Sequence, residues 1–179
     1  AGVSLLDRVI ARLRPQVTKL VLNANGDPAR FADYGLPVVA DSVPGFAGPL
    51  AGVLAGLDWA AAHGADCSHI VSAATDAPFL PRDLVARLAH GLEEAGADLA
   101  CAASGGRSHP VFGLWPVRLK EDLRRAVVED GIRKVDLFTA RYKLATVEFA
   151  DRPVDPFFNA NRPEDFATAA ALVAANGTA

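Results

Sequence analysis

Short apolar segments alternate with helical segments along almost the whole chain, and this alternation restricts the fold more than any other feature. Apolar runs with strand character cover residues 19–23, 36–40, 67–73, 98–102, 111–115 and 145–149. Helical patterns run from Ser4 to Pro15 and over residues 49–62, 81–92, 117–128, 132–142 and 163–175. Such alternation implies right-handed crossovers and a mostly parallel sheet covered on both faces. We therefore predict a three-layer αβα, Rossmann-like α/β fold.

The composition is that of one ordinary globular domain. The chain has 179 residues, 51% of them hydrophobic, and a net charge of -3. A chain of this length buries roughly 70% of its unfolded surface, so we predict a single domain over residues 1–179. No apolar stretch approaches the ~18 residues of a membrane span, and the basic residues do not form a nucleic-acid-binding patch. The cysteine count of two argues against a disulfide scaffold and predicts a cytoplasmic location.

Three predicted strands end in polar residues that suit ligand binding. Asn23 and Asn25 follow the first strand, Asp41 follows the second, and Asp76 follows the third. In open parallel sheets, ligands bind beyond the carboxyl ends of the strands, where loops and helix N-termini converge. Helices that begin after such loops add partial positive charge and free N–H groups, which favour phosphate. The pattern predicts a phosphate-containing ligand at this edge.

Asp76 is the most informative of these residues. A carboxylate on the loop that leaves a buried strand reaches a bound metal ion without being buried itself. Mg²⁺ prefers oxygen ligands and is held by one or two carboxylates together with water and substrate phosphates, so one aspartate is sufficient. Capping of the turn before Pro78 explains Asp76 equally well.

The other strand-end residues also have two interpretations. Asn23 and Asn25 offer amide donors and acceptors to a base or a ribose, but the sequence Asn-Ala-Asn-Gly is equally ordinary turn chemistry. Asp41 has the same ambiguity between a loop cap and a ribose or base contact. Gly48 and Gly52 let a ligand approach the backbone at a helix start, or they serve tight helix-to-strand packing.

A polar glycine loop over residues 104–110 carries Arg107 and His109. These side chains suit contact with phosphate, and a hairpin connection explains the glycines just as well. The chain has four histidines, and none has a metal-ligating spacing with Cys or another His. We therefore set a zinc site aside.

Taken together and in order, short segments of the chain resemble the molybdenum cofactor guanylyltransferases. They are Asn23-Ala24-Asn25, Asp41, residues 48–52 (GPLAG), residues 76–81 (DAPFLP), residues 107–112 (RSHPVF) and residues 158–165 (FNANRPED). The resemblance extends from about residue 5 to residue 165. An ordered set of this kind is much more specific than a single glycine motif. The family implies a nucleotidyltransferase sheet of the predicted type.

The resemblance implies transfer of GMP from GTP to the molybdopterin-type molybdenum cofactor, with Mg²⁺. The products are the guanine dinucleotide cofactor and pyrophosphate. Asn23 matches an asparagine that contacts GTP, and Asp41 matches the aspartate at the guanosine. Asp76 matches the catalytic, magnesium-binding aspartate. The family often has Thr after this aspartate, whereas this chain has Ala77, which removes a hydrogen bond near the metal.

The molybdopterin side of the site is implied in the same way. Asn159 and Asn161 match late asparagines that face the acceptor, and we place Arg107 and His109 on that side as well. The implied partners are GTP and the molybdopterin cofactor, together with molybdoenzymes or other cofactor-biosynthesis proteins. Neither nucleic acid nor a membrane is among them.

The start of the chain departs from the family pattern. Members begin with a strand and a glycine-rich loop that carries Arg and Lys and wraps the triphosphate, and no equivalent precedes Ala1. Because that strand is normally central to the sheet, its loss exposes a long apolar edge. The chain also contains no Met. We therefore expect the natural protein to be longer, with this strand and loop ahead of residue 1.

Two other functions remain open from the sequence. A cytidylyltransferase or a sugar-phosphate nucleotidylyltransferase uses the same sheet and a similar metal-binding aspartate, and differs in base or acceptor. A non-catalytic protein that binds the cofactor and delivers it to a partner is an alternative of another class. The lack of a phosphate-binding loop in this sequence favours that alternative.

Overall fold

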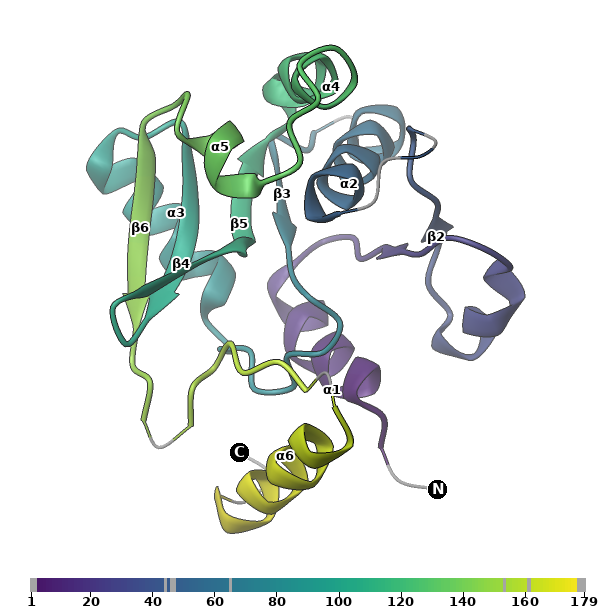
Figure 1. The fold of residues 1–179 in the computed structure, drawn as a ribbon, viewed down its shortest axis with the longest axis vertical. Coiled ribbons are helices and arrows are strands. Elements are labelled where there is room, and N and C mark those ends of the chain that lie inside the picture. Colours follow the sequence, from purple (N-terminus) through teal and green to yellow (C-terminus); the bar gives the residue numbers. More distant parts are fainter. Residues whose placement is uncertain are drawn as a thin grey trace.

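Within the residues that the structure describes, a four-stranded sheet with the order β3-β5-β4-β6 forms the centre of the molecule (Figure 1). The computed structural model describes residues 3–43, 45, 48–64, 66–152, 154–160 and 162–176. The strands of this sheet are β3 (His69–Ser72), β4 (Leu99–Ser104), β5 (Arg107–Pro116) and β6 (Leu144–Phe149). β4 and β6 pair in parallel, and β5 is antiparallel to both β3 and β4. Thus β3, β4 and β6 run in one direction and β5 in the other.

A second, smaller sheet consists of β1 (Leu22–Asn23) and β2 (Val38–Val39), which pair in parallel. The N–H of Leu22 donates to the carbonyl of Pro37 at 2.9 Å, which continues the pairing beyond the strand ends. Both strands are shorter than the apolar runs that predicted them. Across the described ranges, β1 pairs only with β2 and β3 only with β5, so each has one edge without a partner strand.

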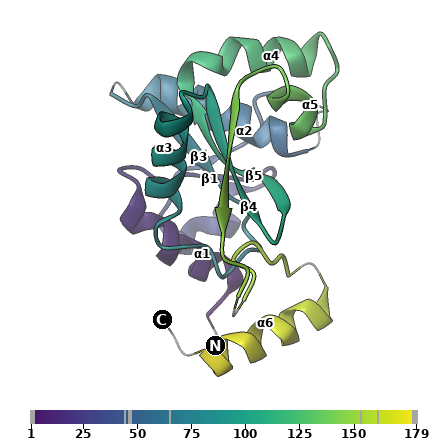
Figure 2. The same cartoon turned by 90° about the vertical axis from the view of Figure 1, so that its left-hand side faces the viewer.

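Helices cover both faces of the β3–β6 sheet, and Figure 2 shows α3 on one side of it and α5 on the other. The helices are α1 (Leu5–Leu13), α2 (Pro49–His63), α3 (Leu84–Ala95), α4 (Lys120–Val128), α5 (Val135–Thr139) and α6 (Pro163–Asn176). One core lies between α1, α3 and the sheet, around Leu84 and Leu88. The other lies between α2, α4, α5 and the sheet, around Trp115 and Phe138. The predicted three-layer α/β fold is confirmed.

The helix ends follow the local signals in the sequence. Ser4 caps α1, because its hydroxyl accepts from the N–H of Asp7 at 3.1 Å while its own N–H donates to the Asp7 carboxylate at 2.9 Å. Pro49 occupies the first turn of α2, where a missing N–H costs little. Gly96 ends α3 in a left-handed conformation, with φ of +53°. None of the helices in the described part of the chain is both long and apolar enough to cross a membrane.

Residues 104–110 form a β-hairpin and not an open loop. β4 and β5 pair across a turn at Gly105 and Gly106, whose φ values of +55° and +76° favour glycine. β5 therefore begins at Arg107, four residues before the predicted strand. Of the two interpretations of this segment, the structure shows the hairpin, and it places Arg107 and His109 on a strand.

Two further segments differ from the prediction. The helix expected over residues 132–142 is the five-residue α5, which ends in tight turns through Tyr142. A 3-10 helix at Pro28–Tyr34, capped by the side chain of Asp27, has no counterpart in the prediction. It lies between β1 and β2 and lengthens their crossover.

Candidate nucleotide site

Asn23, Asn25 and Asp41 meet at the carboxyl ends of β1 and β2. The side-chain amides of Asn23 and Asn25 donate to the two carboxylate oxygens of Asp41, at 3.0 and 2.8 Å. The N–H of Asp41 donates to the side-chain oxygen of Asn25 at 2.9 Å. The parallel pairing of β1 and β2 produces this arrangement because it places both strand ends at one edge. The cluster presents amide and carboxylate groups, which suit the polar edge of a base or a ribose.

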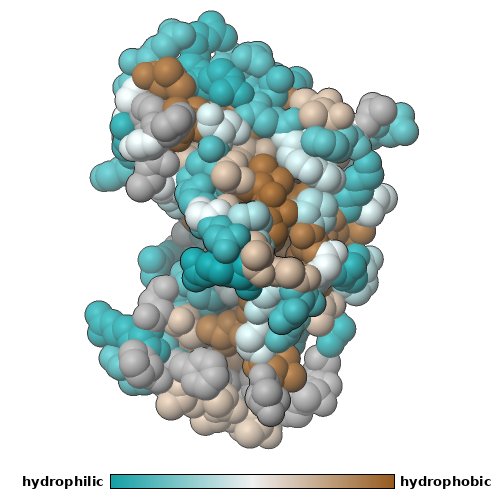
Figure 3. Space-filling view, turned by 90° about the vertical axis from the view of Figure 1, so that its right-hand side faces the viewer, coloured by the Kyte–Doolittle hydropathy of each residue, from teal (hydrophilic) through white to brown (hydrophobic). Residues whose placement is uncertain are grey.

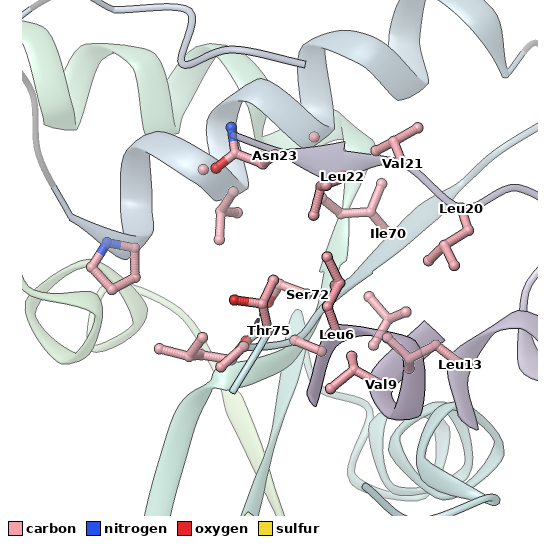
Figure 4. A pocket seen from close by; sticks show the side chains of 18 of the residues that line it. Leu6, Val9, Leu13, Leu20, Val21, Leu22, Asn23, Ile70, Ser72 and Thr75 are labelled. Atoms are coloured by element: carbon pink, nitrogen blue, oxygen red, sulfur yellow. Dashed lines mark hydrogen bonds between the residues drawn. The ribbon is translucent and has the colours of Figure 1, made fainter. Parts of the chain in front are cut away.

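A cavity of about 420 Å³ lies between β1 and β3, and both Asn23 and Asp76 line it. In Figure 4 the polar side chains of Asn23, Ser72 and Thr75 lie toward one end of the cavity, and Leu13 and Leu20 lie toward the other. The structure thus brings the strand-end residues together, because Asp41 is bonded to Asn23, and Asn23 shares the cavity with Asp76.

The N-terminal end of α2 faces the same cavity. Gly48, Pro49 and Gly52 all line it, so the partial positive charge of this helix end lies beside Asn23 and Asp76. A Cβ atom at Gly52 would lie 2.6 Å from the side-chain oxygen of Asn23. The sequence left two interpretations of Gly52, close approach of a ligand and tight packing of the helix on a strand. The structure shows the packing directly, and the side chain packed against Gly52 is that of Asn23, a candidate ligand-binding residue.

The polar end of the cavity, near Asp76, fits a magnesium ion that has a single protein carboxylate among its ligands. Asp76 is half-buried on the loop after β3, and Thr75 lines the cavity with it. The side chains of both residues carry oxygen, which Mg²⁺ prefers as a ligand. The hydroxyl of Ser72 also lines the cavity, but it donates to the carbonyl of Val111 and accepts from Nε1 of Trp115. Over the described part of the chain, no group of three or more His, Cys, Asp and Glu side chains is arranged to hold a metal ion. A metal ion at Asp76 would thus take its remaining ligands from water and phosphate.

The segment that carries Asn159 lies against the Asp76 loop. The N–H of Ala160 donates to the carbonyl oxygen of Asp76 at 3.1 Å, and the rings of Phe158 and Phe79 lie 6.5 Å apart. Asn159 is exposed between these contacts. Asn161, which the sequence analysis placed beside it, lies outside the described residues.

His109 lies farther along the same edge, on β5. Its Nε2 atom is 2.8 Å from the Oγ of Ser104, which donates to the Asp155 carboxylate at 2.9 Å. Burial lowers the pKa of His109, and Arg107 lowers it further, while Asp155 and Glu148 act in the opposite direction. Arg107 is exposed at the start of β5. No contact found among the described residues joins Arg107 to the cluster around Asp41.

Sequence reasoning missed Ser104 and Asp155, which support His109. Ser104 ends β4 and is 4% exposed, and Asp155 precedes the buried Pro156-Phe157 pair. A serine at the end of an otherwise apolar strand was the available signal. The partner of that serine was not predictable, because Asp155 is 51 positions away in the sequence.

The comparisons with known proteins agree with the residue pattern. Residues 1–143 match the family model of the MobA-like NTP transferase domain. A molybdenum cofactor guanylyltransferase of Bradyrhizobium sp. (strain ORS 278) is 64% identical over 97% of this chain and 82% of its own. Another, from Rhodopseudomonas palustris (strain BisB5), is 65% identical over 94% of this chain and 80% of its own.

A solved structure supports the fold independently. Molybdopterin-guanine dinucleotide biosynthesis protein A from Archaeoglobus fulgidus matches with a TM-score of 0.73 over 96% of this chain and 86% of that one. Its sequence identity is 22%, so this likeness concerns the fold alone. The sequence relatives carry the family assignment, and they confirm the one expected from the motifs. The chain belongs to the MobA-like NTP transferase domain family and, within it, to the molybdenum cofactor guanylyltransferases.

Proposed function

We propose that this chain transfers GMP from GTP to the molybdopterin-type molybdenum cofactor, giving the guanine dinucleotide cofactor and pyrophosphate. The observation that carries the proposal is the cavity between β1 and β3, where Asn23, bonded to Asp41, lies together with Asp76. This cavity combines groups for a nucleoside, for a metal ion and, at the start of α2, for phosphate. The membership in the guanylyltransferases supports GTP as the nucleotide.

The reaction is an in-line displacement at the α-phosphorus of GTP. An oxygen of the terminal phosphate of molybdopterin forms the new P–O bond, and the bond to the bridging oxygen of the leaving pyrophosphate breaks. The attacking phosphate is already ionised at neutral pH, so no general base is needed. The protein's work is positioning and charge neutralisation, as in other phosphoryl transfers.

Asn23 and Asp41 would position the guanosine, and the N-terminal end of α2 would bind phosphate oxygens. Asp76 would hold Mg²⁺, which when bound neutralises the charge that develops on the phosphate oxygens. Ala77, where relatives of the family often carry Thr, is fully buried. Its side chain is therefore packed into the core next to the metal-binding residue.

Asn159, Asn161, Arg107 and His109 would form the molybdopterin side of the site. The hydrogen bond from the N–H of Ala160 to the carbonyl of Asp76 supports this role for Asn159. It would hold the segment that carries Asn159 beside the reacting phosphate. His109 lies on the same edge of the sheet. The exposed Arg107 supplies positive charge at its rim.

We also propose that an additional strand fills the apolar part of the cavity. Among the residues that the structure describes, β1 and β3 each have one edge without a partner strand, and Leu6, Val9 and Ile70 line the space between them. The space-filling view of the side that carries β2 also shows hydrophobic side chains at mid-height (Figure 3). A strand joined to α1 by a right-handed crossover would fit here. Its following loop would reach the edge that carries Asn23, where a glycine-rich phosphate loop belongs.

Amide hydrogen exchange tests this strand. The N–H groups of Leu22 and Ala24 bond to the β2 segment, so those of Val21 and Asn23 point to the other side. In a chain extended upstream of residue 1 by the proposed strand, the Val21 and Asn23 amides should exchange more slowly than in residues 1–179 alone. Equal exchange in both would contradict the proposal.

A cytidylyltransferase or sugar-phosphate nucleotidylyltransferase is the rival enzyme, and a cofactor-delivery protein is the rival binding function. Turnover of GTP and of CTP with molybdopterin as acceptor separates all three. We expect pyrophosphate release with GTP and much less with CTP. Preference for CTP would support the first rival, and cofactor binding without turnover would support the second.

We also propose a cytoplasmic location and, as partners, molybdoenzymes or other cofactor-biosynthesis proteins. Cys67 and Cys101 are both free thiols, and Cys67 is exposed, which fits a reducing, cytoplasmic compartment. Molybdoenzymes or other cofactor-biosynthesis proteins would receive or supply the cofactor. Co-purification of the cofactor-loaded protein with such a partner is the corresponding measurement.

A further inference from the structure

Asp155, Ser104 and His109 form a chain of hydrogen bonds at the carboxyl edge of the sheet. Ser104 is buried, and its hydroxyl hydrogen goes to the Asp155 carboxylate at 2.9 Å. A hydroxyl has one hydrogen, so the 2.8 Å contact with His109 requires Nε2 of the ring to donate. A neutral His109 therefore carries its proton on Nε2, and its Nδ1 is an acceptor. The burial that lowers the pKa of His109 favours this neutral form.

Phe157 holds this chain of bonds in place. Its ring centroid lies 4.8 Å from those of His109 and Phe112 and 5.4 Å from that of Phe149. Its N–H donates to the same Asp155 oxygen that accepts from Ser104, at 2.9 Å. Because Phe157 is 3% exposed, the beginning of the 155–160 segment is fixed to the sheet.

The other end of the 155–160 segment is fixed to the metal-binding loop. Ala160 bonds to the carbonyl of Asp76, and Phe158 packs near Phe79. Asn159 therefore lies between two anchors, one at Asp155 and one at Asp76. A change at Ser104 or Asp155 removes hydrogen bonds from the first anchor and leaves the second in place.

We propose that Ser104 and Asp155 are positioning residues for the acceptor substrate, which they serve by fixing His109 and the segment that carries Asn159. The acceptor Nδ1 of His109 suits an N–H group of the pterin ring. It does not suit a phosphate, whose oxygens are acceptors at neutral pH. Together His109 and Asn159 would read the pterin portion of molybdopterin. This inference rests on the proposed function.

The Ser104→Ala variant tests the inference, because it removes both bonds of the hydroxyl with little change of volume. In the full chain we expect the KM for molybdopterin to rise about tenfold, as for one or two lost hydrogen bonds, and the KM for GTP to change by less than about twofold. The KM for molybdopterin should rise less in Asp155→Asn, which keeps an accepting oxygen, than in Asp155→Ala.

Thr139→Val is the matched control. Thr139 is the other buried polar side chain in the described part of the chain, and its hydroxyl donates to the carbonyl of Asp136 within α5. Losing this buried hydroxyl should lower the unfolding temperature without changing the KM for either substrate. An equal rise in the molybdopterin KM in both variants would mean that Ser104 acts only through stability, and would overturn the inference.

Long-range proton–nitrogen NMR of the histidine rings gives a second readout that needs no variant. His109 should carry its proton on Nε2 in the wild-type protein, and a proton on Nδ1 would overturn the inference even if Ser104→Ala does not fold. Wild-type protein that transfers no GMP would refute the proposed function. Active wild-type protein with an unchanged molybdopterin KM in Ser104→Ala would refute only the positioning role.

Discussion

The side-chain oxygen of Asn23 lies 2.6 Å from the place where a Cβ atom at Gly52 would be. Real Cβ atoms do not approach an oxygen so closely, so a side chain at this position in α2 would displace Asn23. Asn23 would then lose its 3.0 Å bond to Asp41. The glycine that lines the nucleotide cavity is thus required by the neighbouring asparagine.

The Gly52→Ala variant should therefore lose affinity for GTP while it stays folded. Alanine improves helix propensity by about 1 kcal/mol, which offsets part of the steric cost. We expect the KM for GTP to rise about tenfold, the effect of a displaced hydrogen-bonding side chain. Gly56→Ala in the same helix is the control, because its Cβ would meet only the flexible end of Ile70 at 3.0 Å. Equal GTP kinetics in both variants would contradict the assignment of Asn23.

Gly91→Ala should destabilise the fold without any effect on the site. A Cβ atom at Gly91 would lie 2.5 Å from Cγ2 of Val147, where α3 packs on β6. Overpacking of this kind costs about 1–3 kcal/mol. Urea denaturation should show this loss, and the double variant Gly91→Ala with Val147→Ala should recover part of it. A single variant as stable as the wild type would show that α3 and β6 are less closely packed.

Stability should fall when the pH is lowered through the range in which His109 titrates. Burial lowers the pKa of His109 in the folded protein, whereas the pKa of a histidine in the unfolded chain is about 6.5. The unfolded state therefore binds the proton first, so His109 stabilises the fold above about pH 6.5 and loses this contribution between that pH and its lowered pKa. The His109→Gln variant should have a flatter dependence of the unfolding free energy on pH. An unchanged slope would contradict the burial of this ring.

The sequence was sufficient for the fold class and for the cluster of strand-end residues. Apolar runs marked where each strand lies, and the polar residues that follow them were the right ones to consider together. Asn23 and Asp41 meet at the ends of the paired strands β1 and β2, whereas Asp76 follows β3 of the larger sheet and lines the cavity that Asn23 also lines. The hairpin between β4 and β5 was harder to predict from the sequence. Residues 107–110 lack an alternating apolar pattern, and they belong to a strand because they pair with β4.

The support for His109 was not predictable from the sequence. Ser104 and Asp155 are 51 positions apart, and neither stands in a motif that points to the other. The same is true of the bond between Ala160 and Asp76, which joins segments more than 80 positions apart. Contacts of this kind depend on tertiary packing, which periodicity and local signals do not encode.

Magnesium-dependent GMP transfer by wild-type protein and the Asp76→Ala variant is the most direct measurement of the central claim. Removing one electrostatic group that stabilises developing charge typically costs about 10²–10³-fold in rate. We expect a loss of at least this size in Asp76→Ala, with an unfolding temperature close to that of the wild type, because Asp76 is only half-buried. Wild-type rates in a folded Asp76→Ala variant would contradict the claim that this cavity holds a magnesium nucleotide.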